Sequence, residues 1–218
     1  MKTKTFNARS ITLIGMLGAL STVLMMFNFP LPFAPAFLKF DIAELPALFA
    51  GFFLGPLSGC AVVVIKILLK LVMEGTDTAF VGEFMNVVGS SVFVLSASLI
   101  YKFRRTKAGA VIGLSFASVL VSILFIYLNI YVGFPMYERL YGMSLGTIIE
   151  MGAAVNPFIH DTFSMMIFAF LPFNLLKHGV TSAVTYLIYK RCGAALRSVV
   201  SVGHTIGADS KASGVHSL

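Results

Sequence analysis

Charged side chains are scarce in this chain, and their scarcity argues against a soluble globular domain. Only 11% of the 218 residues are Asp, Glu, Lys or Arg, whereas 58% are hydrophobic and the mean hydropathy is +0.93. A soluble domain carries about a quarter charged residues. The composition therefore indicates an integral membrane protein, and a single helical bundle accounts for its length.

Cysteines and catalytic motifs are lacking as well. Cys60 and Cys192 are too few and too far apart for a disulfide scaffold or a metal site. The chain has no G-x-x-x-x-G-K-[ST] for nucleotide phosphates, no H-E-x-x-H and no G-x-S-x-G. His160 and Asp161 are adjacent, so they would diverge on a helix, and we expect a structural or interfacial role for them rather than catalysis. The sequence predicts neither an enzyme nor a bound cofactor, so any ATPase would be a partner protein.

Long apolar runs are present instead, and they predict an all-α membrane protein with six transmembrane helices. A helix needs about 20 residues to cross the hydrocarbon core. The second predicted helix is short, and Gly55-Pro56 separates it from the third; one long helix over 43–73 is the alternative. Residues 145–171 are expected to form an outer, partly helical cap. The predicted helices cover residues 11–28, 43–54, 57–73, 81–103, 108–132 and 172–189.

Positive charge is distributed in a way that predicts topology. The 16 Lys and Arg outnumber the nine Asp and Glu, but they cluster in short segments between apolar runs, which argues against a nucleic-acid partner. With six spans, both termini and the loop after the fourth span share one side, which holds 11 of these 16 residues. That side is predicted to be cytoplasmic. Residues 1–191 would form the membrane domain and 192–218 a disordered cytoplasmic tail.

Charged residues inside the predicted spans favour buried pairs. Lys66 and Lys70 share one face of the third helix, and Glu83 and Asn86 share one face of the fourth. Counted from the turn between the helices, Lys70 lies at the depth of Glu83, and Lys66 at that of Asn86. A lone charge at such depth is costly, so we expect these residues to face each other as structural pairs, with ligand contact as the alternative.

A second polar group gathers near the predicted outer face. Asn174 and Lys177 lie three residues apart after Pro172, which is expected in the first helical turn. Either Asn174 caps the helix while Lys177 extends its ammonium group to the membrane interface, or the two residues form the floor of a polar pocket. Asparagine offers both a donor and an acceptor, which suits a heterocycle edge. Nearby aromatics could enclose a flat ring, although an interfacial aromatic belt explains them equally well; they are Phe33, Phe37, Phe40, Tyr127, Tyr131 and Phe173.

Several motifs together resemble the riboflavin-specific S-components of energy-coupling factor (ECF) transporters. They are the segment 34–47, Gly55-Pro56, Gly82-Glu83 with Asn86, Asn156-Pro157-Phe158, and the segment 172–177. The resemblance covers roughly residues 11–191. It implies a six-helix bundle in a bacterial cell membrane, with extracellular loops capping a pocket that binds riboflavin from outside. It also implies association with a transmembrane coupling protein and two ATPase subunits, and flavin mononucleotide (FMN) is a further candidate ligand.

The same resemblance implies roles for individual residues. Leu38, Lys39 and Asp41 fall in the loop that covers the ligand, while Asn129, Asn174 and Lys177 match polar ligand contacts. In the first helix the family's small-residue docking motif reads Gly15-x-x-x-Ala19, and internal helix packing is an equal explanation for it. An S-component for another vitamin, or a stand-alone secondary transporter, are the alternative functions.

Overall fold

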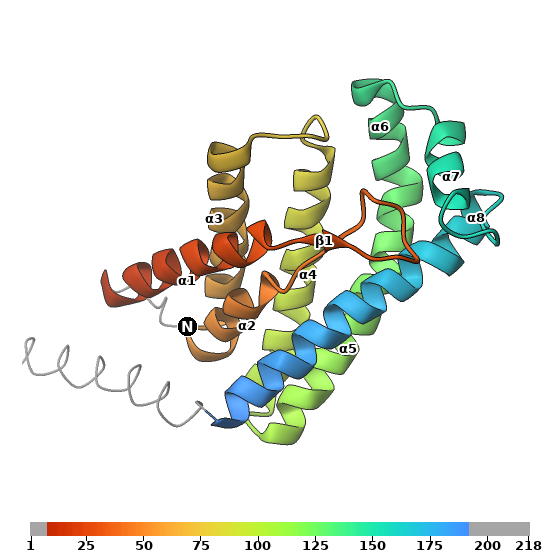
Figure 1. Ribbon diagram of the computed structural model, residues 1–218. Coiled ribbons are helices and arrows are strands. Elements are labelled where there is room, and N and C mark those ends of the chain that lie inside the picture. Colours follow the sequence, from red (N-terminus) through yellow and green to blue (C-terminus); the bar gives the residue numbers. More distant parts are fainter. Residues whose placement is uncertain (1–7, 192–218) are drawn as a thin grey trace, which may run out of the picture.

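The computed structural model describes residues 8–191, so the predicted tail and Cys192 lie outside the described residues. Within them, five helices are long and apolar enough to cross a membrane, and a sixth apolar helix is short, as predicted. The number of spans and the cytoplasmic location of the termini stay predictions. The first helices are α1 (Ala8–Met26), α2 (Glu44–Phe53), α3 (Pro56–Glu74), α4 (Val81–Phe103) and α5 (Lys107–Leu128) (Figure 1).

The break between α2 and α3 confirms two helices over residues 43–73 rather than one. Gly55 has φ 116° and ψ 161°, a backbone conformation that is essentially restricted to glycine. Pro56 follows in the first turn of α3, where its missing N–H would have no helical partner anyway. The turn is held by backbone hydrogen bonds from Gly55 N–H to the Ala50 carbonyl and from Ser58 N–H to the Gly55 carbonyl.

The short helix α2 lies at the centre of the bundle. Every residue from Glu44 to Phe52 is buried. Glycines allow this close packing: a Cβ added at Gly59 would lie 2.4 Å from Cγ1 of Val94 and one at Gly51 only 2.0 Å from Oγ of Ser98. The apolar core thus forms where α1, α3 and α4 surround α2.

The last two long helices extend further than the sequence predicted. After α5 the chain continues through a π-helical turn, η1 (Asn129–Gly133), into α6 (Phe134–Tyr141). The C-terminal helix, Thr162–Arg191, begins with α8 (Thr162–Met165) and a second π-helical turn, η2 (Met166–Phe170). The prediction that this helix starts at Pro172 was therefore wrong. A π-helical turn just before a proline absorbs the missing hydrogen bond, so Pro172 lies inside the helix instead of starting it.

The predicted outer cap is correspondingly shorter and ends at Asp161. It contains α7 (Leu145–Ala153) and the loop that leads to the C-terminal helix. Asp161 is the N-cap of that helix and accepts a 2.6 Å hydrogen bond from the Ser164 backbone N–H. Hydrogen bonds from Ser164 lower the pKa of Asp161 below its ordinary value. The structural role expected for Asp161 is confirmed, while His160 is exposed beside it.

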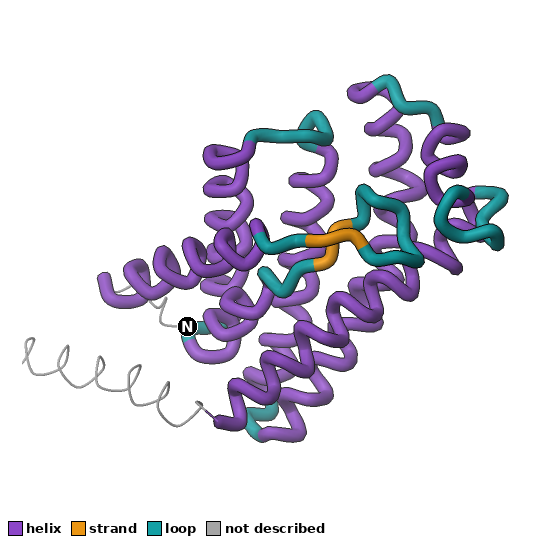
Figure 2. Tube along the Cα trace, viewed as in Figure 1, coloured by secondary structure: helices purple, strands orange, loops and turns teal. Residues whose placement is uncertain are grey.

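The Pro-rich loop between α1 and α2 forms a small hairpin. Strands β1 (Phe29–Pro30) and β2 (Lys39–Phe40) pair antiparallel, with Phe29 opposite Phe40 and their ring centroids 5.4 Å apart. Figure 2 shows the hairpin crossing the bundle between α1 and the C-terminal helix. This placement brings Lys39 and Asp41 to the rim of the cavity described next.

Candidate functional site

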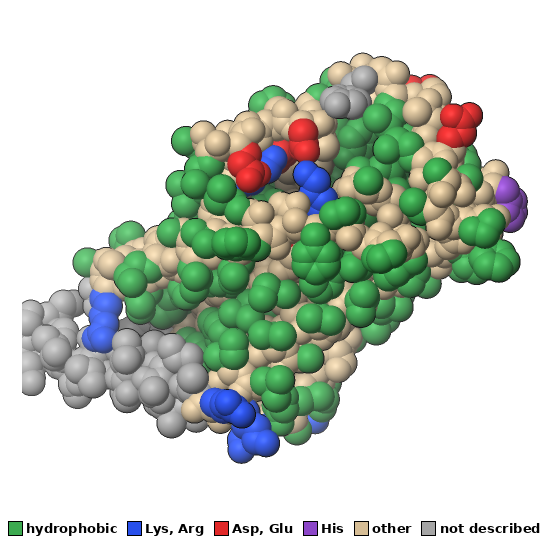
Figure 3. Space-filling model, in the orientation of Figure 1, with side chains coloured by type: hydrophobic (Ala, Val, Ile, Leu, Met, Phe, Trp, Pro, Cys, Tyr) green, Lys and Arg blue, Asp and Glu red, His purple; other side chains and the backbone are tan. Residues whose placement is uncertain are grey.

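One hollow on a largely apolar face is surrounded by both acidic and basic side chains (Figure 3). Figure 3 shows acidic and basic side chains around this hollow, while a separate group of basic side chains lies at the opposite end of the molecule. The hollow opens into a cavity of about 450 Å³, within the range of about 300–1,000 Å³ that is typical of small-molecule sites. All six predicted substrate-binding residues line it: Leu38, Lys39, Asp41, Asn129, Asn174 and Lys177.

Two asparagines on one wall are held in the same way. Asn129 Nδ2 donates to the Phe125 carbonyl at 2.7 Å, and Asn174 Nδ2 donates to the Phe170 carbonyl at 2.8 Å. Each amide is thus anchored one turn back on its own helix, next to a π-helical turn. Within the described residues, neither Oδ1 receives a hydrogen bond, so both amides retain an acceptor and one N–H for a ligand.

Aromatic rings complete this wall, but they are mostly not the predicted ones. Of the six aromatics suggested by the sequence, Phe37 and Phe173 line the cavity. Tyr127 and Tyr131 stack on each other and are 58% and 72% exposed, so they do not enclose a ligand; Phe33 and Phe40 do not line the cavity either. The sequence missed four rings that do: Phe125, Phe134, Tyr137 and Phe170.

Asp41 and Lys177 form a buried ion pair across the cavity rim. Lys177 Nζ lies 2.9 Å from Asp41 Oδ2, and both residues are buried. The other carboxylate oxygen of Asp41 accepts the Ala43 N–H at 2.9 Å, just before α2. The pair therefore joins the end of the hairpin to the C-terminal helix. An ammonium has three donors, so Lys177 can still offer hydrogen bonds to a ligand.

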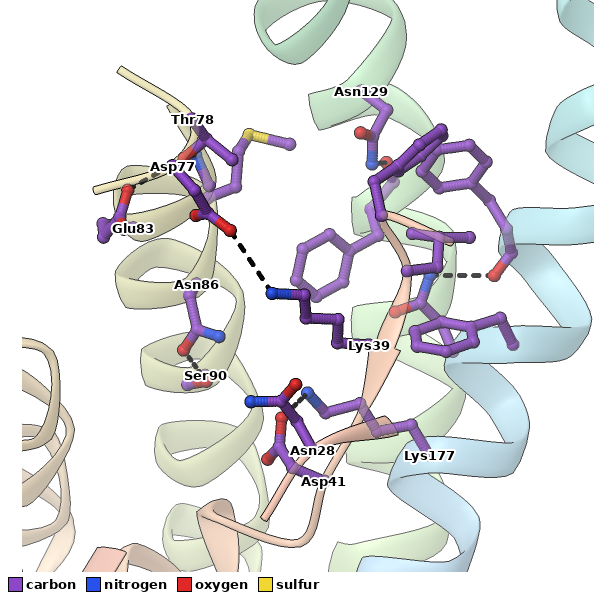
Figure 4. A pocket seen from close by; sticks show the side chains of 18 of the residues that line it. Asn28, Lys39, Asp41, Asp77, Thr78, Glu83, Asn86, Ser90, Asn129 and Lys177 are labelled. Carbon is purple, nitrogen blue, oxygen red and sulfur yellow. Dashed lines mark hydrogen bonds and ion pairs between the residues drawn. The ribbon is translucent and has the colours of Figure 1, made fainter. Parts of the chain in front are cut away.

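Lys39 reaches from the hairpin across the cavity to the opposite wall. Its Nζ lies 3.3 Å from Asp77 Oδ2, in the turn between α3 and α4 (Figure 4). Leu38, the preceding residue, is half-buried and also lines the cavity. These positions agree with the expectation that the first loop covers the pocket.

The opposite wall is polar: Lys70, Glu83 and Asn86 line it, and Lys66 is buried next to Asn86. Lys66 Nζ lies 2.9 Å from Asn86 Oδ1, and Lys70 Nζ lies 2.7 Å from Glu83 Oε1. The pairing inferred from helical depth is therefore confirmed. Glu44 is a further partner that was not predicted, and its Oε1 lies 3.1 Å from Lys66 Nζ. The sequence signal for this partner was the presence of an acidic residue, Glu44, within the otherwise apolar run that forms α2.

His178 is a second residue that sequence reasoning missed. It is buried next to Lys177, with its ring 4.6 Å from that of Phe93 and 6.1 Å from that of Phe125. Within the described residues, neither of its ring nitrogens has a hydrogen-bond partner. The burial of this histidine could not be predicted from residue spacing, because it depends on aromatic rings that α4 and α5 contribute.

The small residues of α1 divide between two faces. A Cβ at Gly18 would lie 2.5 Å from Cγ2 of Ile65, so Gly18 serves the packing of α1 on α3. Gly15 and Ala19 are exposed, and a Cβ at Gly15 would contact nothing within 4 Å. Internal packing therefore does not explain the Gly15-x-x-x-Ala19 pair.

The comparisons with known proteins agree with this geometry. Residues 9–189 match the family described as ECF transporter, substrate-specific component. The chain belongs to this family. Family membership identifies it as a component of a transporter and as a multi-pass membrane protein, which agrees with the prediction that it is not an enzyme.

Individual relatives cover nearly the whole chain. The riboflavin transporter RibU of Staphylococcus aureus is 32% identical over 193 residues, which span 88% of this chain and 94% of the relative. The riboflavin transporter FmnP of Bacillus subtilis is 29% identical and spans 84% of this chain and 91% of its own. A solved structure described as the S component of a bacterial ECF transporter superposes with a TM-score of 0.68 at 30% identity, covering 87% of this chain and 98% of that one.

Proposed function

We propose that this substrate-specific component binds riboflavin at the cavity and delivers it to an ATP-driven ECF importer in a bacterial cell membrane. The observation that supports this most is the pair of anchored amides, Asn129 and Asn174, each with a free Oδ1 beside an aromatic wall. A flat heterocycle with alternating carbonyl and N–H groups matches two such amides and one ammonium. The relatives from Staphylococcus aureus and Bacillus subtilis are named riboflavin transporters, which supports riboflavin in particular.

The assignment of roles follows the two walls of the cavity. Asn129, Asn174 and Lys177 would hold the edge of the ring, and Leu38, Lys39 and Asp41 would cover it from the hairpin. Hydroxyl and amide groups on the other wall, such as Thr76, would face the polyol chain. The flavin is the transported ligand in this proposal, and no resident cofactor is needed.

The partners proposed are a transmembrane coupling protein and two ATPase subunits. The exposed pair Gly15 and Ala19 on α1 is the proposed contact, because small residues let another helix approach closely. The basic residues of the α4–α5 turn lie at the other end of α4 from the cavity mouth, which supports a mouth that faces outward.

Replacing Asn174 tests the binding site. We expect Asn174→Ala to weaken riboflavin binding by about tenfold, because a lost buried hydrogen bond costs about 1.5 kcal/mol. Quenching of flavin fluorescence by the detergent-purified protein measures the affinity. Leu175→Ala is the matched control, since Leu175 is the next residue and lies 39% exposed on the outer face of the same helix. Unchanged affinity in Asn174→Ala would discard the site.

The ligand itself can be identified without mutation. Wild-type protein purified without added ligand should be yellow and show a flavin absorption spectrum. Release of a different vitamin on denaturation would support the alternative S-component function. Failure to co-purify ATPase subunits from the native membrane would support a stand-alone transporter instead.

A further inference from the structure

The wall of the cavity formed by α3, α4 and the turn between them is charged. The ammonium groups at this wall are already paired with carboxylates. Lys39 Nζ lies 3.3 Å from Asp77, and Lys70 Nζ lies 2.7 Å from Glu83 and 3.9 Å from Asp77. Asp77 therefore stands between the two ammonium groups that could otherwise receive an anion. Figure 4 shows Asp77 facing Lys39 across the cavity.

The charges on the cavity lining have an acidic excess. In the described part of the chain, its lysines are Lys39, Lys70 and Lys177, and each lies within 4 Å of a carboxylate. Five carboxylates line the same cavity: Asp41, Glu44, Glu74, Asp77 and Glu83. Glu44 is paired with Lys66, which is buried outside the lining, so one carboxylate remains in excess of the ammonium groups. An incoming anion would have to displace one of these carboxylates or lie among them.

Asp77 remains ionised at neutral pH. Burial alone would raise its pKa, but the hydrogen bond and charge of Lys39 and the charge of Lys70 outweigh this and lower the pKa of Asp77. The Asp77 side chain is 65% exposed, so it lies at the mouth, where a ligand's outer end would pass. Its negative charge thus acts at the entrance rather than deep in the core.

Resting on the proposed function, we propose that Asp77 is a specificity-determining residue that makes the cavity select neutral riboflavin over its phosphate ester, FMN. A phosphate group carries about −1.5 to −2 charges at pH 7. Near this wall the phosphate of FMN would lie close to the carboxylates of Asp77 and Glu83. The ammonium groups of Lys39 and Lys70 are already neutralised by these carboxylates. A neutral polyol meets the same groups as hydrogen-bonding partners, without a charge penalty.

Comparing the two flavins on three variants tests this role. Wild-type protein should bind riboflavin at least about tenfold more tightly than FMN. In Asp77→Asn the ratio of the two dissociation constants should fall by about tenfold, the size expected for one charge next to a phosphate near a protein surface. In Lys39→Gln, which removes the main partner of Asp77, the ratio should rise. Glu150→Gln is the matched control, because Glu150 is exposed on α7 and does not line the cavity.

The ratio separates this inference from the proposed function. Equal wild-type affinity for both flavins, or the same ratio in Asp77→Asn as in Glu150→Gln, would overturn the role of Asp77 and leave riboflavin binding standing. A shift of the ratio in the same direction in Asp77→Asn and Lys39→Gln would also overturn it, because it would indicate general loosening of the mouth. Binding of neither flavin by the wild-type protein would overturn both proposals.

Discussion

At the scale of single residues, every ammonium group buried in the described bundle has a carboxylate partner. Lys66 pairs with Glu44 at 3.1 Å, and Lys177 pairs with Asp41 at 2.9 Å. A charge without a partner in this apolar setting would be very costly. One pair joins α3 to α2 and the other joins the C-terminal helix to the end of the hairpin, so the placement of charge also favours these elements as neighbours.

Replacing Glu83 tests whether its pair is structural. Glu83 contacts Lys70 and also accepts hydrogen bonds from Thr76 and Thr78, both at 3.0 Å. We expect Glu83→Gln to lower the free energy of unfolding by about 2 kcal/mol, because hydrogen bonds to a charged group are lost. Thermal melting in detergent measures this, and riboflavin titration should show a smaller effect on affinity.

The control for this prediction is Glu74→Gln, which removes the same charge from an exposed position at the end of α3. Unchanged melting together with lost binding in Glu83→Gln would show that Glu83 serves the ligand rather than the fold.

At the scale of helices and turns, two long helices are built alike. Each contains a π-helical turn shortly before a proline, Pro135 in one helix and Pro172 in the other, and each positions an asparagine at the cavity. The extra residue in a π-helical turn rotates the following side chains relative to a regular helix. We infer that the second turn helps to aim Asn174 at the cavity, whereas Asn129 is itself the first residue of its turn.

The turn between α2 and α3 offers a direct test of backbone control. Gly55→Ala should lower the free energy of unfolding by about 1–3 kcal/mol, because φ 116° is a glycine-only conformation. The space around Gly55 is open, so a steric clash with neighbours would not contribute. Gly179→Ala is the control, since that glycine also has open space but lies in a regular helix. Equal melting temperatures for the two variants would contradict the strain argument.

The sequence predicted the helices well where apolar runs ended in charges or Gly-Pro, as at Phe103 and Gly55. It failed at Pro172, because a proline that follows a π-helical turn looks like the start of a helix. The pairing of Lys66 with Asn86 could be predicted from depth alone. An acid within the apolar run of α2 indicated that Glu44 needs a partner, but the identity of that partner could not be predicted, because it depends on how α2 inserts between α3 and α4.

At the scale of the whole molecule, α1 leaves one face free. Only Ile14, Gly18, Ser21 and Thr22 are buried in this helix. Its exposed face carries Gly15 and Ala19, while the charged cavity opens on the side of the hairpin. Ligand binding and the proposed docking of the coupling protein thus use separate surfaces.

This separation predicts a variant that binds ligand but does not assemble. Ala19→Leu should reduce co-purification with the coupling protein by at least about tenfold, since a bulky side chain prevents close helix approach. Riboflavin affinity should stay within about twofold of wild type. Ser115→Leu, on the exposed face of α5, is the control and should assemble normally. Normal assembly of Ala19→Leu would move the docking surface elsewhere.

The hairpin that covers the cavity is held by two ion pairs of unequal strength, one at Lys39 and one at Asp41. Breaking the exposed Lys39–Asp77 contact costs about 1 kcal/mol or less, whereas separating a buried pair such as Asp41–Lys177 costs about 3–5 kcal/mol. The hairpin should therefore open as a hinged segment. It stays attached at Asp41 and separates from the bundle along the edge near Asp77. A flavin would enter and leave past the α3–α4 turn, where the barrier is lowest.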